Sequence, residues 1–249
     1  MFQYSACSPM RKSYILRFVG RALVLLAAVA LYVLHPQSFS ILEGMNFFRK
    51  FSILHLLWGL WVLDMALQMI PSRRFIALGS QKQFGRYFQS APRSPDKEAL
   101  QGFIKSSNRS AAVILALWVA LVLVLGGLHL LGILDRGILV LISAVFYVCD
   151  LICVLFWCPF RVLFMKNRCC TTCRIFNWDH LMMFVHLLFV PSFFTLSLGI
   201  ASVLIFLVWE VKFHRHPEWF WDRSNRALRC ISCTDRLCGR CMSAPEKEK

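Results

Sequence analysis

Cysteines in short, regular spacings are the residues of this chain whose chemistry is easiest to name. The CxxC spacing occurs three times, and one further cysteine adjoins the first pair. The candidate metal ligands are therefore Cys169, Cys170, Cys173, Cys230, Cys233, Cys238 and Cys241. A CxxC pair lets two thiolates approach one tetrahedral ion with backbone amides turned toward the sulfurs, and two pairs complete a closed four-sulfur site. The spacing predicts a cysteine module that binds metal.

The grouping of these ligands is left open by the spacing. The tail runs CxxC, four residues, then CxxC between Cys230 and Cys241, which is shorter than the linker of a common zinc ribbon. Four tail thiols around one ion would need a tight turn at TDRL. In the alternative, Cys170 and Cys173 share an ion with one tail pair, and the other pair holds a second ion, a cluster or a disulfide.

Three chemistries fit the thiols. Structural zinc, which would fasten the soluble tail, is the first. An iron–sulfur cluster is the alternative, because such spacings also suit a four-iron cluster and the nearby Trp219, Phe220 and Trp221 can shield it from water. Dithiol exchange is the third, although three pairs exceed what a simple exchange couple requires.

The remaining four of the eleven cysteines receive no ligand role: Cys7 stands alone, and Cys149, Cys153 and Cys158 lie in or at the end of an apolar run.

Composition indicates a membrane protein. Of 249 residues, 58% are hydrophobic and the mean hydropathy is +0.59, well above the usual values for a soluble domain. Secreted disulfide scaffolds are excluded, since they are short and poor in long apolar runs. The net charge of +15 does not indicate nucleic-acid binding, because the Lys and Arg residues flank the apolar runs and form no basic face. We expect the lipid bilayer as the main partner and a tail that can be presented to a protein partner at the cytoplasmic face.

Apolar runs predict an all-α integral membrane protein, a six-span helical bundle with a small cysteine-rich cytoplasmic module. The first four spans are Arg17–Leu34, Ser52–Ile70, Ala111–Leu134 and Ile138–Phe160. The last apolar region, Ile175–Val211, is long for one span and short for two. We expect Pro191 to split it into a short fifth and a short sixth span.

The positive-inside rule supports this even number of crossings. With both termini cytoplasmic, the inner segments hold 4 basic residues up to Arg21, 8 in the long loop, 4 from Arg161 to Arg174 and 9 from Lys212 onward, which is 25 of 28. A continuous last span would move the final 9 outside. The chain then divides into a two-span part at 1–70, a basic cytoplasmic loop at 71–110, a four-span part at 111–211 with a cysteine-rich loop at 161–174, and a cysteine-rich cytoplasmic tail at 212–249.

Two carboxylates, Asp64 and Asp150, fall well inside predicted spans, where an unpaired charge is costly. Both lie toward the cytoplasmic ends of their spans, so we expect them to share one layer of the bundle, with Arg21 and His186 as candidate partners. Their role is either a polar pocket for a lipid headgroup, a proton or a metal ion, or a structural hydrogen bond that locks helices together.

No hydrolase elbow, phosphate-binding loop, dinucleotide fingerprint or HExxH motif occurs in the chain, so no reaction is predicted. Three functions are compatible with the sequence. The first is an accessory or scaffold membrane protein with a zinc-stapled tail. The second is an iron–sulfur redox protein that passes electrons to a lipid-soluble acceptor. The third is a lipid-modifying enzyme or small transporter that uses Asp64 and Asp150.

Overall fold

The structure is a computed structural model that describes residues 9–71, 81–92, 96–230, 233 and 237. Over these residues the regular elements are all helical. The α-helices are α1 (Pro9–Leu34), α2 (Asn46–Arg49), α3 (Leu54–Met69), α5 (Lys97–Leu130), α6 (Arg136–Leu155), α7 (Asp179–Phe184) and α8 (Phe193–Arg215). Short 3-10 or π segments join them: η1 (Pro36–Leu42), η2 (Gly85–Tyr87), η3 (Phe160–Met165), η4 (Cys170–Thr172), η5 (Arg174–Trp178), η6 (Val185–Phe189), η7 (Pro217–Phe220) and η8 (Arg226–Leu228).

Four helices, α1, α5, α6 and α8, are long and apolar enough to cross a membrane. The outer helices α1 and α5 leave most of their apolar side chains uncovered by protein, as Leu23 (60% exposed) and Leu123 (61%) illustrate. Exposed apolar surface of this extent is compatible with contact to lipid. The chain is therefore a helical protein suited to a bilayer.

The region around Pro191 differs in part from the expectation. The chain does break there, because proline offers no amide hydrogen and Ser192 starts α8 with a capping box to Thr195. The prediction of a short sixth span is wrong, however, since α8 is 23 residues long. The shortening falls entirely on the segment before the break, where η5, α7 and η6 follow one another over residues 174–189.

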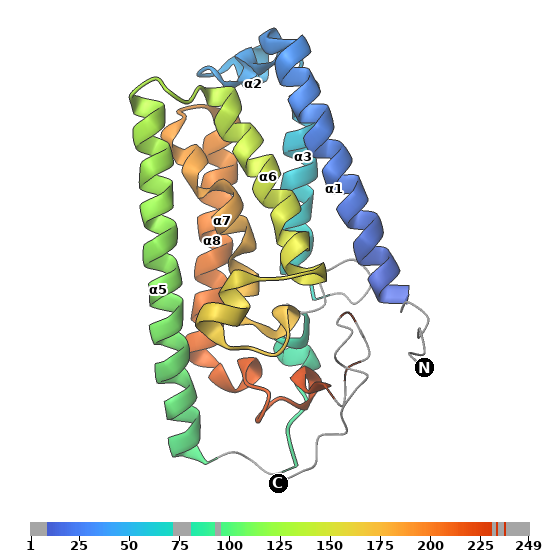
Figure 1. The fold of residues 1–249 in the computed structure, drawn as a ribbon, viewed down its shortest axis with the longest axis vertical. Coiled ribbons are helices and arrows are strands. Elements are labelled where there is room, and N and C mark those ends of the chain that lie inside the picture. The colour runs from blue at the N-terminus through green and yellow to red at the C-terminus, as the bar shows by residue number, and fades with distance from the viewer. Residues whose placement is uncertain (1–8, 72–80, 93–95, 231–232, 234–236, 238–249) are drawn as a thin grey trace.

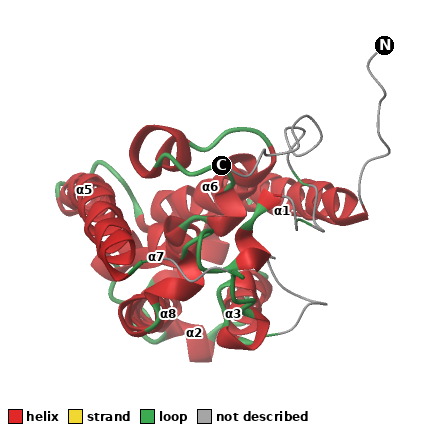
Figure 2. Cartoon of the chain, turned by 90° about the horizontal axis from the view of Figure 1, so that it is seen from below, coloured by secondary structure: helices red, strands yellow, loops and turns green. Residues whose placement is uncertain are grey.

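Successive long segments run in alternating directions (Figure 1). The start of α1, the end of α8 and the segments 81–92 and 156–173 lie at the same end of the bundle. We call the irregular structure there the cap, made of residues 81–92, 158–178 and 217–230. Seen along the bundle, α1 and α5 occupy opposite edges, and α3, α6, α7 and α8 lie between them (Figure 2).

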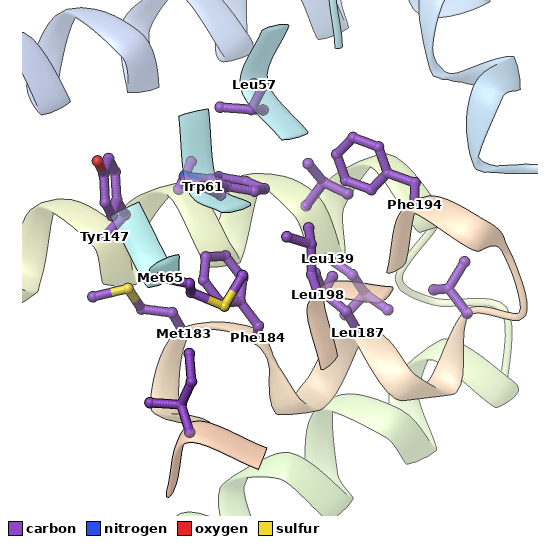
Figure 3. Packing of buried hydrophobic residues seen from close by; sticks show 14 of the residues in the cluster. Leu57, Trp61, Met65, Leu139, Tyr147, Met183, Phe184, Leu187, Phe194 and Leu198 are labelled. Carbon is purple, nitrogen blue, oxygen red and sulfur yellow. The ribbon is translucent and has the colours of Figure 1, made fainter. Parts of the chain in front are cut away.

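The core sits where these four inner helices meet (Figure 3). Trp61 of α3 is fully buried and packs against Phe184 of α7, with ring centroids 5.0 Å apart. Leu139 of α6 and Leu198 of α8 close the same cluster and are also fully buried. Each such side chain contributes about 2 kcal/mol when it is removed from water, and in a bilayer the close packing itself holds the helices together.

Hydrogen bonds hold the three segments of the cap together. Asn225 is fully buried; its amide donates to the carbonyl oxygens of Lys82 and Trp219 and accepts from the backbone amide of Gln89. Gln83, also fully buried, donates to the carbonyl of Thr172. The segment expected as a loop at 71–110 thus contributes a packed strip to the cap, and its last part belongs to α5, which begins at Lys97.

Candidate thiol site and buried ionic network

The loop cysteines lie against the end of α6. Cys170 and Cys173 are both buried in the cap. The thiol of Cys158, three residues past the end of α6, hydrogen-bonds with the side chains of Cys153 and Cys170. Four thiols, from Cys153, Cys158, Cys170 and Cys173, therefore gather at one place.

Backbone amides stand in the same positions beside two of these sulfurs. The amides of Phe160 and Arg161, two and three residues after Cys158, donate to its sulfur, with Arg161 N at 3.5 Å. The amides of Ile175 and Phe176 stand in the same positions relative to Cys173 and oppose the rise of its pKa, and the Phe176 amide donates to the Cys173 carbonyl oxygen at 3.2 Å. Amide donors aimed at sulfur stabilise the thiolate over the thiol, which is the form that ligates metal.

The thiols differ in their ease of ionisation. The pKa of Cys158 is lowered, chiefly by the hydrogen bond from Cys153, then by that from Cys170 and by the two amides. The pKa of Cys170 is raised, because its hydrogen bond to Cys158 favours the protonated form and burial adds to this. Burial raises the pKa of Cys173 to about 12 against the opposing effect of its amide donors. Before any ion binds, Cys158 is thus the thiolate of the set, and its neighbours are protonated thiols.

All four cysteines line one cavity of about 90 Å³. Asp150 and Asp179 also line it, and the remaining walls are mostly apolar, with Trp118, Phe146 and Met182 among them. The space is large enough for an ion or a water molecule.

The tail cysteines are placed only in part. Cys230 and Cys233 are half-buried, Cys169 beside the loop pair is half-buried as well, and Cys238 and Cys241 lie outside the described residues. Leu237 is buried in a cluster with Tyr14 and Leu151, which places this residue at the cap-side ends of α1 and α6. In the described part of the chain, no three His, Cys, Asp or Glu side chains are already spaced to hold an ion. The sharing of one ion between the loop and tail pairs stays a prediction.

Sequence reasoning missed Cys153 and Cys158 because they belong to an apolar run. Pro159 was the available indication: a helix ends before a proline, so the thiol just before it leaves the lipid-facing surface. The Cys153 to Cys158 spacing then brings a helical thiol and a post-helical thiol to the same end of α6.

A buried ionic network lies next to the thiols, on the other side of Asp150. The Arg21 guanidinium donates to Asp150 Oδ2 at 2.7 Å and to Asp64 Oδ2 at 3.1 Å. It also lies 3.8 Å from the centre of the Tyr147 ring and donates to the Tyr147 carbonyl. The two carboxylates therefore do share a layer of the bundle, bridged by Arg21.

The network extends into α7. Gln68 Nε2 donates to Asp179 Oδ1 at 2.9 Å, and His180 donates from Nδ1 to Gln68 Oε1 at 2.5 Å. The other ring nitrogen of His180 lies 3.7 Å from Asp64 Oδ2. Helices α1, α3, α6 and α7 are thus tied together by polar contacts at one level.

The expected partner His186 is not part of this network. Its ring is fully buried and its Nε2 lies 3.1 Å from Ser143 Oγ and 3.1 Å from the Leu139 carbonyl. The prediction is wrong because His186 follows His180 by six residues along a segment that runs away from the cap. The Asp179–His180 pair, at the start of α7, holds the position that the sequence assigned to His186.

A second buried ion pair fixes the cysteine loop to α8. Arg174, 6% exposed, forms a two-point pair with the Glu210 carboxylate and donates to Asn108 Oδ1 at 2.7 Å. Trp178 Nε1 donates to Glu210 at 2.8 Å. Bidentate pairs of this kind orient both partners, so residues 170–178 are held against α5 and α8.

Comparison with known proteins adds no assignment. No protein-family model, curated protein or solved structure matches this chain.

Proposed function

We propose that this chain is a multi-pass membrane protein that binds a thiophilic metal ion, zinc in the first instance, through Cys153, Cys158, Cys170 and Cys173, in an accessory or scaffold role. The observation that carries the proposal is the convergence of these four cysteines on one small cavity, with the Arg161 amide 3.5 Å from the Cys158 sulfur. Four thiolates complete a closed tetrahedral site, which suits a structural ion.

The ion would draw the sulfurs together. At present Cys158 holds its neighbours through hydrogen bonds, and an ion would replace those protons, as metal sites are seldom fully formed before binding. Zinc in this position would fasten the segment that carries Cys170 and Cys173 to the end of α6. Iron–sulfur chemistry is the alternative, with the same thiols as ligands.

Elemental analysis of the full chain, purified in detergent without added chelator, tests the proposal. To distinguish metal bound by the cap cysteines from metal bound by the tail cysteines, we would measure a background variant. In it, Cys230, Cys233, Cys238 and Cys241 are changed to serine. We expect about one zinc per chain there, and loss of most of it on further Cys158→Ser or Cys173→Ser exchange. Cys149→Ser is the matched control, because this half-buried thiol lines the same cavity outside the set of four.

Two results would overturn the zinc assignment. A brown protein with broad visible absorption and iron in place of zinc would favour the cluster. A metal content that Cys158→Ser leaves unchanged would remove the cap site altogether. A disulfide between cap cysteines in freshly purified protein, found by mass spectrometry, would favour dithiol exchange.

We further propose that six segments cross the bilayer, with residues 174–189 as the fifth and both termini in the cytosol. Support comes from the alternating directions of the segments and from the distribution of basic residues. In this topology the outer loops contain no cysteine. Wild-type protein in intact cells should therefore resist an impermeant maleimide, whereas Glu43→Cys, at a 60%-exposed side chain beyond α1, should be labelled. Labelling of a cysteine appended to the C-terminus in intact cells would contradict the topology.

For Asp64 and Asp150 we propose a structural role in place of transport or lipid modification. Arg21 compensates both carboxylates, and the network joins four helices. Compensated charges at membrane depth lock helix packing.

A further inference from the structure

The connection between α1 and α3 presents large apolar side chains to its surroundings. It lies at the end of the bundle opposite the cap (Figure 1). We call its residues 45–53 the outer segment. The large apolar side chains of this segment that are more than half exposed are Met45 (60%), Phe48 (61%), Phe51 (91%) and Ile53 (57%). Apolar side chains gathered in this way outside the long helices mark an interaction surface.

The outer segment is held in place by the bundle, which fixes the direction of its side chains. Phe47 turns inward, with its ring centroid 4.8 Å from that of Phe193 at the start of α8. The His55 ring of α3 hydrogen-bonds to the Phe47 carbonyl oxygen, 2.9 Å from Nε2. Phe48 and Phe51 are left on the outward side, where protein covers little of either ring.

The length of α3 places the outer segment at the depth of the membrane interface. The helix has 16 residues and extends about 24 Å at about 1.5 Å per residue, whereas the hydrocarbon core is about 30 Å thick. A short span is accommodated in part by the residues that flank it. Phe51 and Ile53 directly precede α3, so their exposed side chains extend its apolar surface toward the headgroups.

The apolar surface of the helices also continues onto the outer segment. A groove of about 440 Å³ lies between α1 and α3, and its lining runs from Val24 to His35 on one side and from Ile53 to Leu60 on the other. Ile53 belongs both to this groove and to the outer segment. No polar strip therefore separates the segment from the part of the bundle that is suited to lipid.

The charges of the connection favour lipid phosphate as the partner. Arg49 and Lys50 are exposed, and neither forms an ion pair with a residue that the structure describes. The single acid between α1 and α3 is Glu43, which pairs with Arg136 at 3.5 Å. Exposed aromatic rings next to cations are typical of segments that lie in the headgroup layer, with the rings toward the hydrocarbon and the cations near phosphates.

We propose that the outer segment inserts into the headgroup layer of the bilayer and that its partner is phospholipid. Phe48 and Phe51 enter the edge of the hydrocarbon, and Arg49 and Lys50 reach the phosphates. The segment then fixes the depth of α3, and with it the level of Asp64 in the membrane. The inference rests on the proposed membrane protein, and it uses the proposed topology only to name the side.

The first test compares two cysteine variants in intact cells. Phe51→Cys and Glu43→Cys each place one thiol in a loop that has none. By protein contacts alone, position 51 (91% exposed) is more accessible than position 43 (60%). Covered by lipid, Phe51→Cys should react with an impermeant maleimide at least about tenfold more slowly, because maleimide reacts with the thiolate and a partly desolvated thiol ionises less readily. Similar rates for the two variants would overturn the proposal.

The second test identifies what covers the segment and does not depend on orientation. The full chain with p-benzoylphenylalanine in place of Phe51 is irradiated in nanodiscs of phosphatidylcholine and phosphatidylglycerol, and mass spectrometry detects the adducts. We expect phospholipid adducts at this position and only traces of them when the same residue replaces Glu43. A cross-linked second copy without lipid adducts, or no more lipid adduct than at position 43, would overturn the proposal.

The two tests separate this inference from the topology. If neither cysteine is labelled in cells, the proposed topology is wrong, and the nanodisc result alone decides whether the segment lies in the headgroup layer. If Glu43→Cys is labelled and Phe51→Cys is labelled as fast, the topology stands and this inference fails.

Discussion

Arg21 on α1 and Asp150 on α6 form an ion pair at 2.7 Å between residues 129 positions apart in the sequence. The two side chains are 13% and 12% exposed. Because the same guanidinium also holds Asp64 on α3, one cation sets the relative positions of three helices. The pair is adjacent to the thiol cavity, since Asp150 lines that cavity as well.

Removal of one member of this network is expected to destabilise the bundle. Asp150→Leu leaves Arg21 buried with Asp64 alone, and loss of a partner in a buried pair costs about 3 kcal/mol or more. Reversible unfolding in mixed detergent micelles measures the change in the free energy of unfolding. Glu43→Gln is the control, because its pair with Arg136 is 46–60% exposed and should contribute less than about 1 kcal/mol. Equal stability of the two variants would contradict the structural role.

The sequence predicts this layer well because membrane depth is a strong constraint. A carboxylate inside a span needs a partner, and Arg21 was the nearest cation at matching depth. The choice of His186 failed because the helical path before Pro191 could not be placed from a region that is apolar throughout. Four helices long enough to cross a membrane follow directly from length and hydropathy. The second predicted span is the shorter helix α3, of 16 residues, and the broken segment 174–189 is defined by tertiary packing.

The docking of the tail could not have been predicted from cysteine spacing. The structure uses Asn225, whose partners are backbone atoms of Lys82, Gln89 and Trp219. Side-chain bonds to distant backbone atoms leave no periodic pattern in a sequence. Of the four cysteines that meet at the cavity, Cys170 and Cys173 were predicted as ligands and Cys153 and Cys158 were not. The last two cannot be distinguished from core cysteines until the end of α6 is known.

Substitution of two neighbouring glycines on α5 by a larger residue should affect the stability of the protein differently. A Cβ on Gly126 would lie 2.3 Å from the Phe189 ring, whereas a Cβ on Gly127 meets nothing within 4 Å. Gly126→Leu should therefore separate α5 from η6 and lower stability by about 2 kcal/mol, as overpacking does. Gly127→Leu should be neutral or slightly stabilising. The thermal midpoints of both proteins in one detergent provide the comparison, and a Gly127→Leu protein that is the less stable would contradict this packing.

Loss of the Asn225 amide should release residues 217–230 from the rest of the cap. Asn225→Ala leaves the Lys82 and Trp219 carbonyls and the Gln89 amide without this partner, at about 1 kcal/mol or more for each group that stays buried. Hydrogen exchange should then accelerate in 81–92 and 217–229 while α3 and α6 stay protected. Ser90→Ala, at an exposed hydroxyl in the same segment, should leave exchange unchanged. Uniform acceleration across the bundle would instead indicate global destabilisation.

Metal binding at the cap should depend steeply on pH. Cys170 and Cys173 have raised pKa values and are protonated near neutrality, and Cys153 is protonated as the hydrogen-bond donor to Cys158, so all three must release a proton to the solvent when they ligate; Cys158, whose pKa is lowered, releases none. Three protons released make the apparent affinity fall about a thousandfold for each unit of decreasing pH. Competition with a chelator between about pH 6.5 and pH 8, in the background without tail cysteines, gives the slope. Since thiols ionised in advance would bind metal without proton release, an affinity independent of pH would exclude this set of protonated ligands.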